Sequence, residues 1–180
     1  VRVVYWSGKI YTSGRTASRK EDTMELKEAL LARRSVRKYT DEKVSAEHAD
    51  ALMHAAMSGP SACNKRPWAF YIVADADRIA KLRMTTPYTN ITAPMGIIVC
   101  GDLDKALPED RADFWVQDCS AATENILLAA LDLGLGTVWC GIHPKKESVA
   151  IVREILSIPE NLIPLNIIWV GHPAVKTEAR

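Results

Sequence analysis

Apolar residues recur at helical spacing in some stretches of the chain and run together in others. The helical stretches predict helices over residues 24–34, 46–58, 110–133 and 145–156, with a shorter helix over 78–83. The short apolar runs predict strands over residues 68–74, 95–101, 137–140 and 165–170. A mixture of strands and helices around one core is typical of the α+β fold class.

Local signals mark the ends of the first two helices. Leu26, Leu30 and Leu31 share one face of the first helix. Ser45 can cap the second helix through its side-chain oxygen, because an N-cap hydroxyl accepts a hydrogen bond from the first turn. Gly59 is followed by proline, which ends that second helix.

The helix predicted over residues 110–133 is unusual because its part from 121 to 131 is apolar on most faces. Such a helix is buried in a core or in an interface. For one small domain, an interface between two chains is the more economical explanation. Gly134 and Gly136 are expected to end this helix.

Residues 1–23 differ from the rest in being rich in Ser, Thr, Gly, Arg and Lys. Met24 precedes the first clear helical pattern and could be a natural start. We therefore expect residues 1–23 to be a mobile N-terminal extension or a cloning remnant, and residues 24–180 to form the folded domain. The alternative is a short additional strand at Val1–Trp6.

Composition narrows the possible functions. The chain has 180 residues, 48% hydrophobic and 25% charged, with a formal net charge of +1. These values are ordinary for one globular domain, and the balanced charge argues against a nucleic-acid-binding protein. No stretch reads as a membrane span, because charged and polar residues interrupt the longest apolar run. Cys63, Cys100, Cys119 and Cys140 form no CxxC pair, so we expect no metal site and reduced thiols in the cytoplasm.

Arg33, Arg34, Ser35 and Arg37 form a dense cationic cluster directly after the first helix. Guanidinium groups bind phosphate through paired hydrogen bonds, and a serine hydroxyl adds another donor. The cluster therefore favours a ligand with a phosphate group. The ordinary alternative is a solvated helix end, since cations favour the last turn of any helix.

Taken with three further motifs, this cluster resembles the nitroreductase family of FMN-dependent NAD(P)H oxidoreductases, in its compact branch. The motifs occur in the family's order across residues 24–180: Arg33-Arg34-Ser35-Val36-Arg37, Pro60-Ser61-Ala62-Cys63-Asn64 with Pro67-Trp68, Gly134-Leu135-Gly136-Thr137-Val138-Trp139, and Gly171-His172-Pro173-Ala174. The resemblance implies a central, mostly antiparallel sheet flanked by helices. It also implies an interlocked homodimer that binds FMN at the subunit interface.

The resemblance also implies roles for individual residues. Arg33 and Ser35, with Arg34 beside them, match the positions that hold the FMN phosphate, and Arg37 matches a cation at the pyrimidine edge of the flavin. A cation there favours reduced flavin, which carries negative charge around N1 and O2. Lys176 and Arg180 could add phosphate contacts.

A second group of positions matches segments around the flavin ring. The implied cofactor contacts are Pro60, Ser61, Ala62, Cys63 and Asn64 from the second subunit, Leu135, Gly136 and Thr137 along the cofactor, and the backbone N–H groups of Cys140 and Gly141 facing flavin N5 and O4. Cys63 departs from the family, which usually has Ser or Gly there. Arg66 departs where Gln is frequent, and either favours an anionic substrate or faces water.

The activity implied is a two-step cycle in which NADH or NADPH reduces the flavin at N5 and an electron-poor acceptor reoxidises it. Nitroaromatics, quinones and enones are plausible acceptors. This chemistry belongs to the cofactor, so no catalytic side chain is expected. The alternatives are a flavin-binding protein without NAD(P)H turnover and a specialised relative such as a dehalogenase, a ring dehydrogenase or a flavin-degrading enzyme.

Overall fold

The computed structural model describes residues 1–5 and 24–175. Its centre is a five-stranded sheet in the order β1-β2-β3-β5-β4. The strands are β1 (Arg2–Tyr5), β2 (Trp68–Val73), β3 (Met95–Asp102), β4 (Gly136–Gly141) and β5 (Leu162–Gly171). Every pair of neighbouring strands is antiparallel, so the predicted antiparallel sheet is confirmed.

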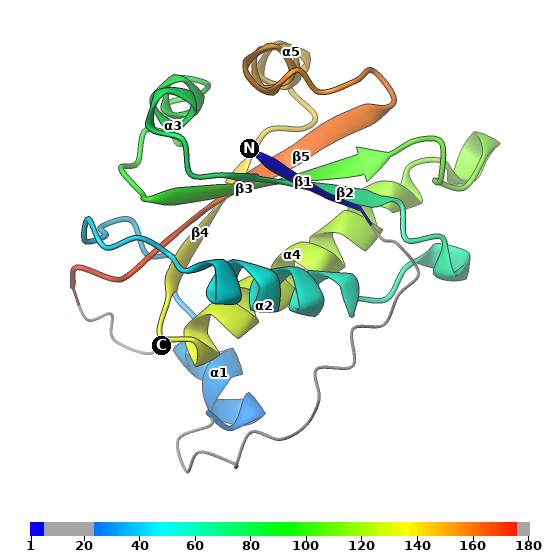
Figure 1. Ribbon diagram of the computed structural model, residues 1–180. Coiled ribbons are helices and arrows are strands. Elements are labelled where there is room, and N and C mark those ends of the chain that lie inside the picture. The colour runs from blue at the N-terminus through cyan, green and yellow to red at the C-terminus, as the bar shows by residue number, and fades with distance from the viewer. Residues whose placement is uncertain (6–23, 176–180) are drawn as a thin grey trace.

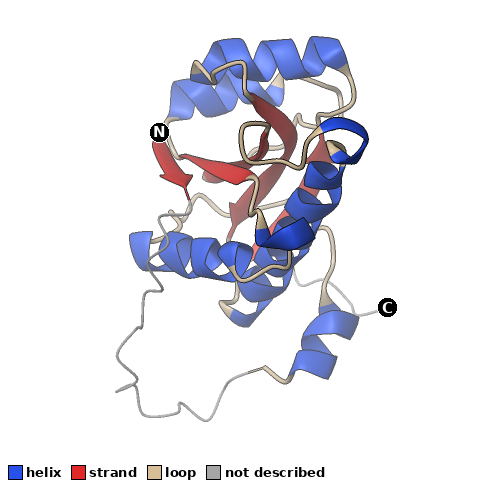
Figure 2. Cartoon of the chain, turned by 90° about the vertical axis from the view of Figure 1, so that its right-hand side faces the viewer, coloured by secondary structure: helices blue, strands red, loops and turns tan. Residues whose placement is uncertain are grey.

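Helices cover both faces of this sheet (Figure 1). On one face lie α2 (Ala46–Met57) and α4 (Phe114–Asp132), which pack against each other. On the other face lie α3 (Ala76–Arg83) and α5 (Lys146–Leu156). The side view in Figure 2 shows the sheet between these two helical layers. Shorter elements are α1 (Leu26–Ala32), η1 (Ala62–Asn64) and η2 (Glu109–Arg111). The α+β architecture is confirmed.

The central strands are buried on both faces, which explains their continuous apolar runs. Along β3 and β5, Ile97 and Ile168 face the α2–α4 layer, whereas Ile98 and Ile167 face the α3–α5 layer. All four are fully buried. Successive side chains of a strand point to opposite faces, so one sheet supplies both halves of the hydrophobic core.

Several boundaries differ from the sequence predictions. The helix predicted from residue 110 begins at Phe114, because residues 109–111 form the separate turn η2. The last strand is longer than predicted and begins at Leu162. Gly134 follows α4 with a φ of 71°, as its predicted role in ending the helix requires.

The N-terminal residues correspond in part to the alternative prediction. Arg2–Tyr5 forms β1, an edge strand paired with β2, so the additional strand is present. The remainder of the predicted extension, residues 6–23, lies outside the described residues.

Two helices leave apolar surface uncovered. In α1, Leu26, Leu30 and Leu31 are 68%, 57% and 59% exposed, and the buried residue is Ala29. The sheet and α2 cover much of the apolar surface of α4, whereas Leu128 and Leu131 of this helix are only partly buried. None of the described helices is long and apolar enough to cross a membrane.

We predict that Gly101→Ala destabilises the fold. A Cβ atom at this position in β3 would lie 2.1 Å from the ring of the buried Trp115 on α4. Overpacking of this kind costs about 1–3 kcal/mol, measurable as a fall in the midpoint of thermal unfolding. Gly141→Ala is the matched control, since a Cβ there meets no atom within 4 Å. Equal midpoints for the two variants would contradict the packing described.

Candidate active site

The basic segment Arg33–Arg37 is attached to the start of β4. The Val36 N–H donates to the Thr137 carbonyl oxygen at 2.8 Å, and Ser35 forms a parallel bridge with Thr137. The buried Val36 side chain packs on Gly136, where an added Cβ would lie 2.8 Å from it. Glycine at 136 is therefore needed for this close approach. Two segments that are far apart in the sequence thus meet at the edge of the sheet.

Tyr39 strengthens this attachment and was not identified from the sequence. Its hydroxyl lies 2.5 Å from the Val36 carbonyl oxygen and 3.2 Å from that of Trp169 on β5. Burial raises the pKa of the Tyr39 phenol, so the hydroxyl keeps the proton that it donates. A lone tyrosine in a loop carries no sequence signal for such a role.

Arg33, Arg34, Ser35 and Arg37 line a polar hollow of about 230 Å³. One carboxylate is close to this cluster: Glu124 on α4 lies 3.6 Å from Arg33 Nε. Arg37 also donates to the Ser35 carbonyl oxygen at 3.4 Å. Three guanidinium groups beside one carboxylate leave a net positive hollow, which suits a dianionic group such as a phosphate monoester.

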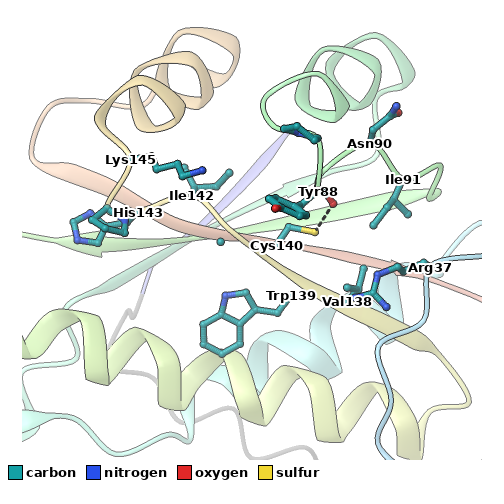
Figure 3. Close-up of a pocket in the computed structure, with 13 residues that line it drawn as sticks. Arg37, Tyr88, Asn90, Ile91, Val138, Trp139, Cys140, Ile142, His143 and Lys145 are labelled. Carbon is teal, nitrogen blue, oxygen red and sulfur yellow. Dashed lines mark hydrogen bonds between the residues drawn. The ribbon is translucent and has the colours of Figure 1, made fainter.

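A larger pocket of about 630 Å³ continues from Arg37 along the outer edge of the sheet (Figure 3). Its wall is formed by β4 from Val138 onward and by the following segment as far as Lys145. The facing loop supplies Tyr88, Asn90 and Ile91. Because Arg37 lines both hollows, the polar hollow and the larger pocket form one continuous surface.

The open edge of β4 presents backbone donors to this pocket. Peptide groups alternate between the two sides of a strand. Thr137 faces outward, toward Val36, whereas the Ile142 N–H faces β5 and donates to Leu165 O. Gly141 therefore directs its N–H outward and Cys140 directs its N–H toward β5. The backbone geometry thus favours Gly141 over Cys140 as the amide donor to a ligand.

The Cys140 side chain faces the pocket with a protonated thiol. Its Sγ lies 3.3 Å from the Tyr88 carbonyl oxygen, drawn as the dashed line in Figure 3. Burial raises the Cys140 pKa to about 11, and the nearby Arg37 opposes this shift. A thiolate is the reactive form of cysteine. Cys140 is thus a neutral part of the wall at physiological pH.

The Pro60–Asn64 loop has a defined conformation. Cys63 and Asn64 have φ values of 49° and 55°, in the left-handed region. The Ala62 N–H donates to Asp118 Oδ1 of α4 at 2.8 Å, and the Ser61 hydroxyl accepts from the Arg66 N–H. Burial raises the pKa of Asp118, and the bond from Ala62 opposes that shift. A buried carboxylate therefore holds the loop in place.

This loop does not line the pocket along β4. Its own hollow, about 300 Å³, is formed by Pro60, Ser61 and Ala62 with residues of α4. That hollow shares no lining residue with the two beside Arg37. Within one chain, the predicted site is therefore divided into two separate parts.

The remaining predicted positions fall into three groups. Cys140 and Gly141 line the pocket. Leu135 packs in the core, and Gly136 and Thr137 are buried beneath the basic segment, so their side chains line neither hollow. Lys176 and Arg180 lie outside the described residues. Among the residues described, no group of three or more His, Cys, Asp or Glu could hold a metal ion.

Comparison with known proteins identifies the family. The sequence model of the nitroreductase family matches residues 30–86 and 87–172. The chain belongs to the nitroreductase family. The matched residues include both the basic segment and β4.

Individual nitroreductase-family relatives agree with this assignment. A candidate NADH dehydrogenase/NAD(P)H nitroreductase of Methanothermobacter thermautotrophicus is 46% identical over 157 residues, covering 86% of this chain and 81% of its own. An FMN reductase [NAD(P)H] of Bacillus subtilis is 31% identical, covering 83% and 66%. A solved candidate nitroreductase of Desulfovibrio desulfuricans, in complex with FMN, has a TM-score of 0.72 and 33% identity, covering 84% and 88%.

We predict that Asp118→Ala loosens the Pro60–Asn64 loop. The substitution leaves the Ala62 N–H without its acceptor, at a cost of about 1–3 kcal/mol, whereas Asp118→Asn retains an acceptor oxygen. Thermal unfolding and the hydrogen exchange of residues 61–66 report the effect. Asp113→Ala is the control, because Asp113 is exposed and caps no helix through its side chain. An Asp118→Ala protein that resembles this control would contradict the role of Asp118.

We also predict that alkylation of Cys140 by iodoacetamide has its midpoint at about pH 11, above the ordinary thiol value of 9.0. The raised pKa keeps the thiol protonated, so the rate rises only when the thiolate forms. Peptide mass spectrometry of protein labelled across a pH series measures this midpoint. A midpoint at or below pH 9 would contradict the burial described.

Proposed function

We propose that the protein is an FMN-dependent NAD(P)H oxidoreductase that acts as a homodimer. When bound, FMN would supply hydride transfer at N5, first from NADH or NADPH and then to an electron-poor acceptor such as a nitroaromatic, a quinone or an enone. The observation that carries this proposal is the continuous surface from the cationic hollow, past Arg37, to the open edge of β4.

The residues present fit FMN at the phosphate end. Arg33, Arg34 and Ser35 would hold the phosphate in the hollow that they line. The attachment of Val36 and Ser35 to Thr137 fixes the backbone of this segment before a ligand binds. Such preorganisation lowers the entropic cost of binding.

The residues also fit the flavin ring. Arg37 stands where the two hollows meet and would place its charge at the pyrimidine edge, favouring the reduced anionic ring. Gly141 would offer its N–H from the open edge of β4, and a Cβ atom added there would meet no atom within 4 Å. The proposed mechanism needs no side chain as an acid or a nucleophile, and the Cys140 thiol is neutral. The redox chemistry then depends on position and charge.

The homodimer is supported by what one chain leaves incomplete. The Pro60–Asn64 loop is held by Asp118 away from the chain's own pocket, so its place over the flavin would be in the partner's site. The exposed leucines of α1 supply apolar surface that a second copy would cover. Four free thiols, three of them buried, are compatible with the cytoplasmic location that forms part of the proposal.

The absorption spectrum tests the proposal. We expect the purified protein, after incubation with FMN and removal of the excess, to show flavin bands that bleach when NADH or NADPH is added without oxygen. Bands that persist with both reductants would favour a flavin-binding protein without turnover. Absence of bound flavin would overturn the proposal.

Substitution of the phosphate cluster gives a second prediction. Arg33→Ala removes a charged contact to phosphate, and we expect FMN affinity to fall about 10-fold to 100-fold, in line with about 1.5–3 kcal/mol for such a hydrogen bond. Fluorescence titration of FMN measures the change. Arg78→Ala is the control, because Arg78 is an exposed arginine on α3 that pairs with Asp75, and neither residue lines the hollows. Equal affinities for the two variants would exclude Arg33 from the site.

A further inference from the structure

The proposed role of FMN leaves one cation of the pocket unused. Arg37 and Lys145 line the pocket from different segments, and no Asp or Glu is among its lining residues. Neither forms an ion pair within the described part of the chain. The proposed function places Arg37 at the flavin but gives Lys145 no anionic group to bind.

Lys145 is placed beyond the proposed flavin edge. Figure 3 shows Arg37 and Lys145 at opposite ends of the pocket, with the nitrogen of Lys145 directed toward Tyr88. Lys145 follows Gly141 by four residues, so it lies past the amide that would meet the flavin. A molecule stacked over this part of the ring would reach Lys145 with a substituent on its far side.

The pocket wall between Arg37 and Lys145 includes apolar and aromatic side chains. Val138 and Ile91 are buried apolar residues, and Tyr88 is 76% exposed at the rim. The His143 ring, which also lines the pocket, packs edge-on against Trp115 with the ring centroids 4.9 Å apart. The pocket therefore has a wall of mixed apolar and polar groups, the polar ones including Asn90 and His143, and it ends at the exposed ammonium group of Lys145.

We propose that the acceptor of this enzyme is a flat, conjugated molecule that carries an anionic group, such as a carboxylate, bound by Lys145. This inference rests on the proposed function and names its class of acceptor. The anion could instead come from the reductant, since NADPH carries an additional phosphate that NADH lacks. Lys145 lies four residues beyond the Gly141 amide proposed to meet the flavin, whereas the additional phosphate of NADPH is on its adenosine half, at the opposite end from the nicotinamide, and this favours the acceptor.

The test compares 4-nitrobenzoate with 4-nitrobenzamide, which have similar shapes but differ in charge. The readout is the ratio of their kcat/KM values in each protein. We expect Lys145→Gln to lower the benzoate-to-benzamide ratio about five- to tenfold and Lys145→Glu to lower it further. We also expect the wild-type ratio to fall as salt is raised, because an exposed charge is screened. Lys146→Gln is the matched control, since Lys146 is exposed but does not line the pocket.

The outcomes separate this inference from the proposed function. An unchanged ratio in Lys145→Gln, or an equal fall in Lys146→Gln, would overturn the role of Lys145 while the flavin still bleaches. A fall in the NADPH-to-NADH ratio of kcat/KM, with the acceptor ratio unchanged, would overturn the acceptor assignment and give the anion to the reductant. A flavin that NADH and NADPH both fail to bleach would overturn the proposed function and this inference with it.

Discussion

The attachment of Val36 to the first residues of β4 is the contact on which the candidate site depends. One backbone hydrogen bond to Thr137 and the packing of Val36 on Gly136 bring the basic segment to an edge strand. Tyr39 ties the same segment to β5 through its hydroxyl group. Without these contacts, the cationic side chains would be an ordinary solvated helix end. With them, the charges are fixed beside a strand edge that offers unpaired backbone donors.

A second feature of the molecule is that the Pro60–Asn64 loop and the pocket along β4 do not form one site within a single chain. The Pro60–Asn64 loop is rigidly held, yet its hollow is separate from the pocket along β4. The leucines of α1 face away from the core. The ordered loop and the exposed leucines of α1 therefore offer surface that is suited to contact with a second copy of the chain. In our proposal, the same association buries the apolar surface and brings the loop to the flavin.

Much of the fold could be predicted from periodicity, because the buried strands and amphipathic helices carry strong patterns. The start of α4 was missed because η2 interrupts the helix without any break in polarity. Arg33, Ser35 and Gly141 could be predicted as site residues from motifs whose chemistry is local. Tyr39, Asp118 and Lys145 were not singled out from the sequence, since the hydrogen bonds of the first two and the pocket beside the third depend on tertiary contacts between distant segments. The backbone alternation that favours Gly141 over Cys140 likewise depends on the pairing of β4 with β5, which the sequence of β4 alone does not contain.

The division of the flavin site between two copies is tested most directly by mixed dimers. Arg33→Ala would damage the phosphate end of a site, and Asn64→Gly would remove the loop side chain while permitting its φ of 55°. We would co-express the two variants with different tags, purify the mixed dimer and titrate it with FMN. A shared site predicts one site of wild-type affinity per mixed dimer, because one of its two sites receives both intact parts. Absence of any high-affinity site in the mixed dimer would show that each site lies within one chain and would contradict the account.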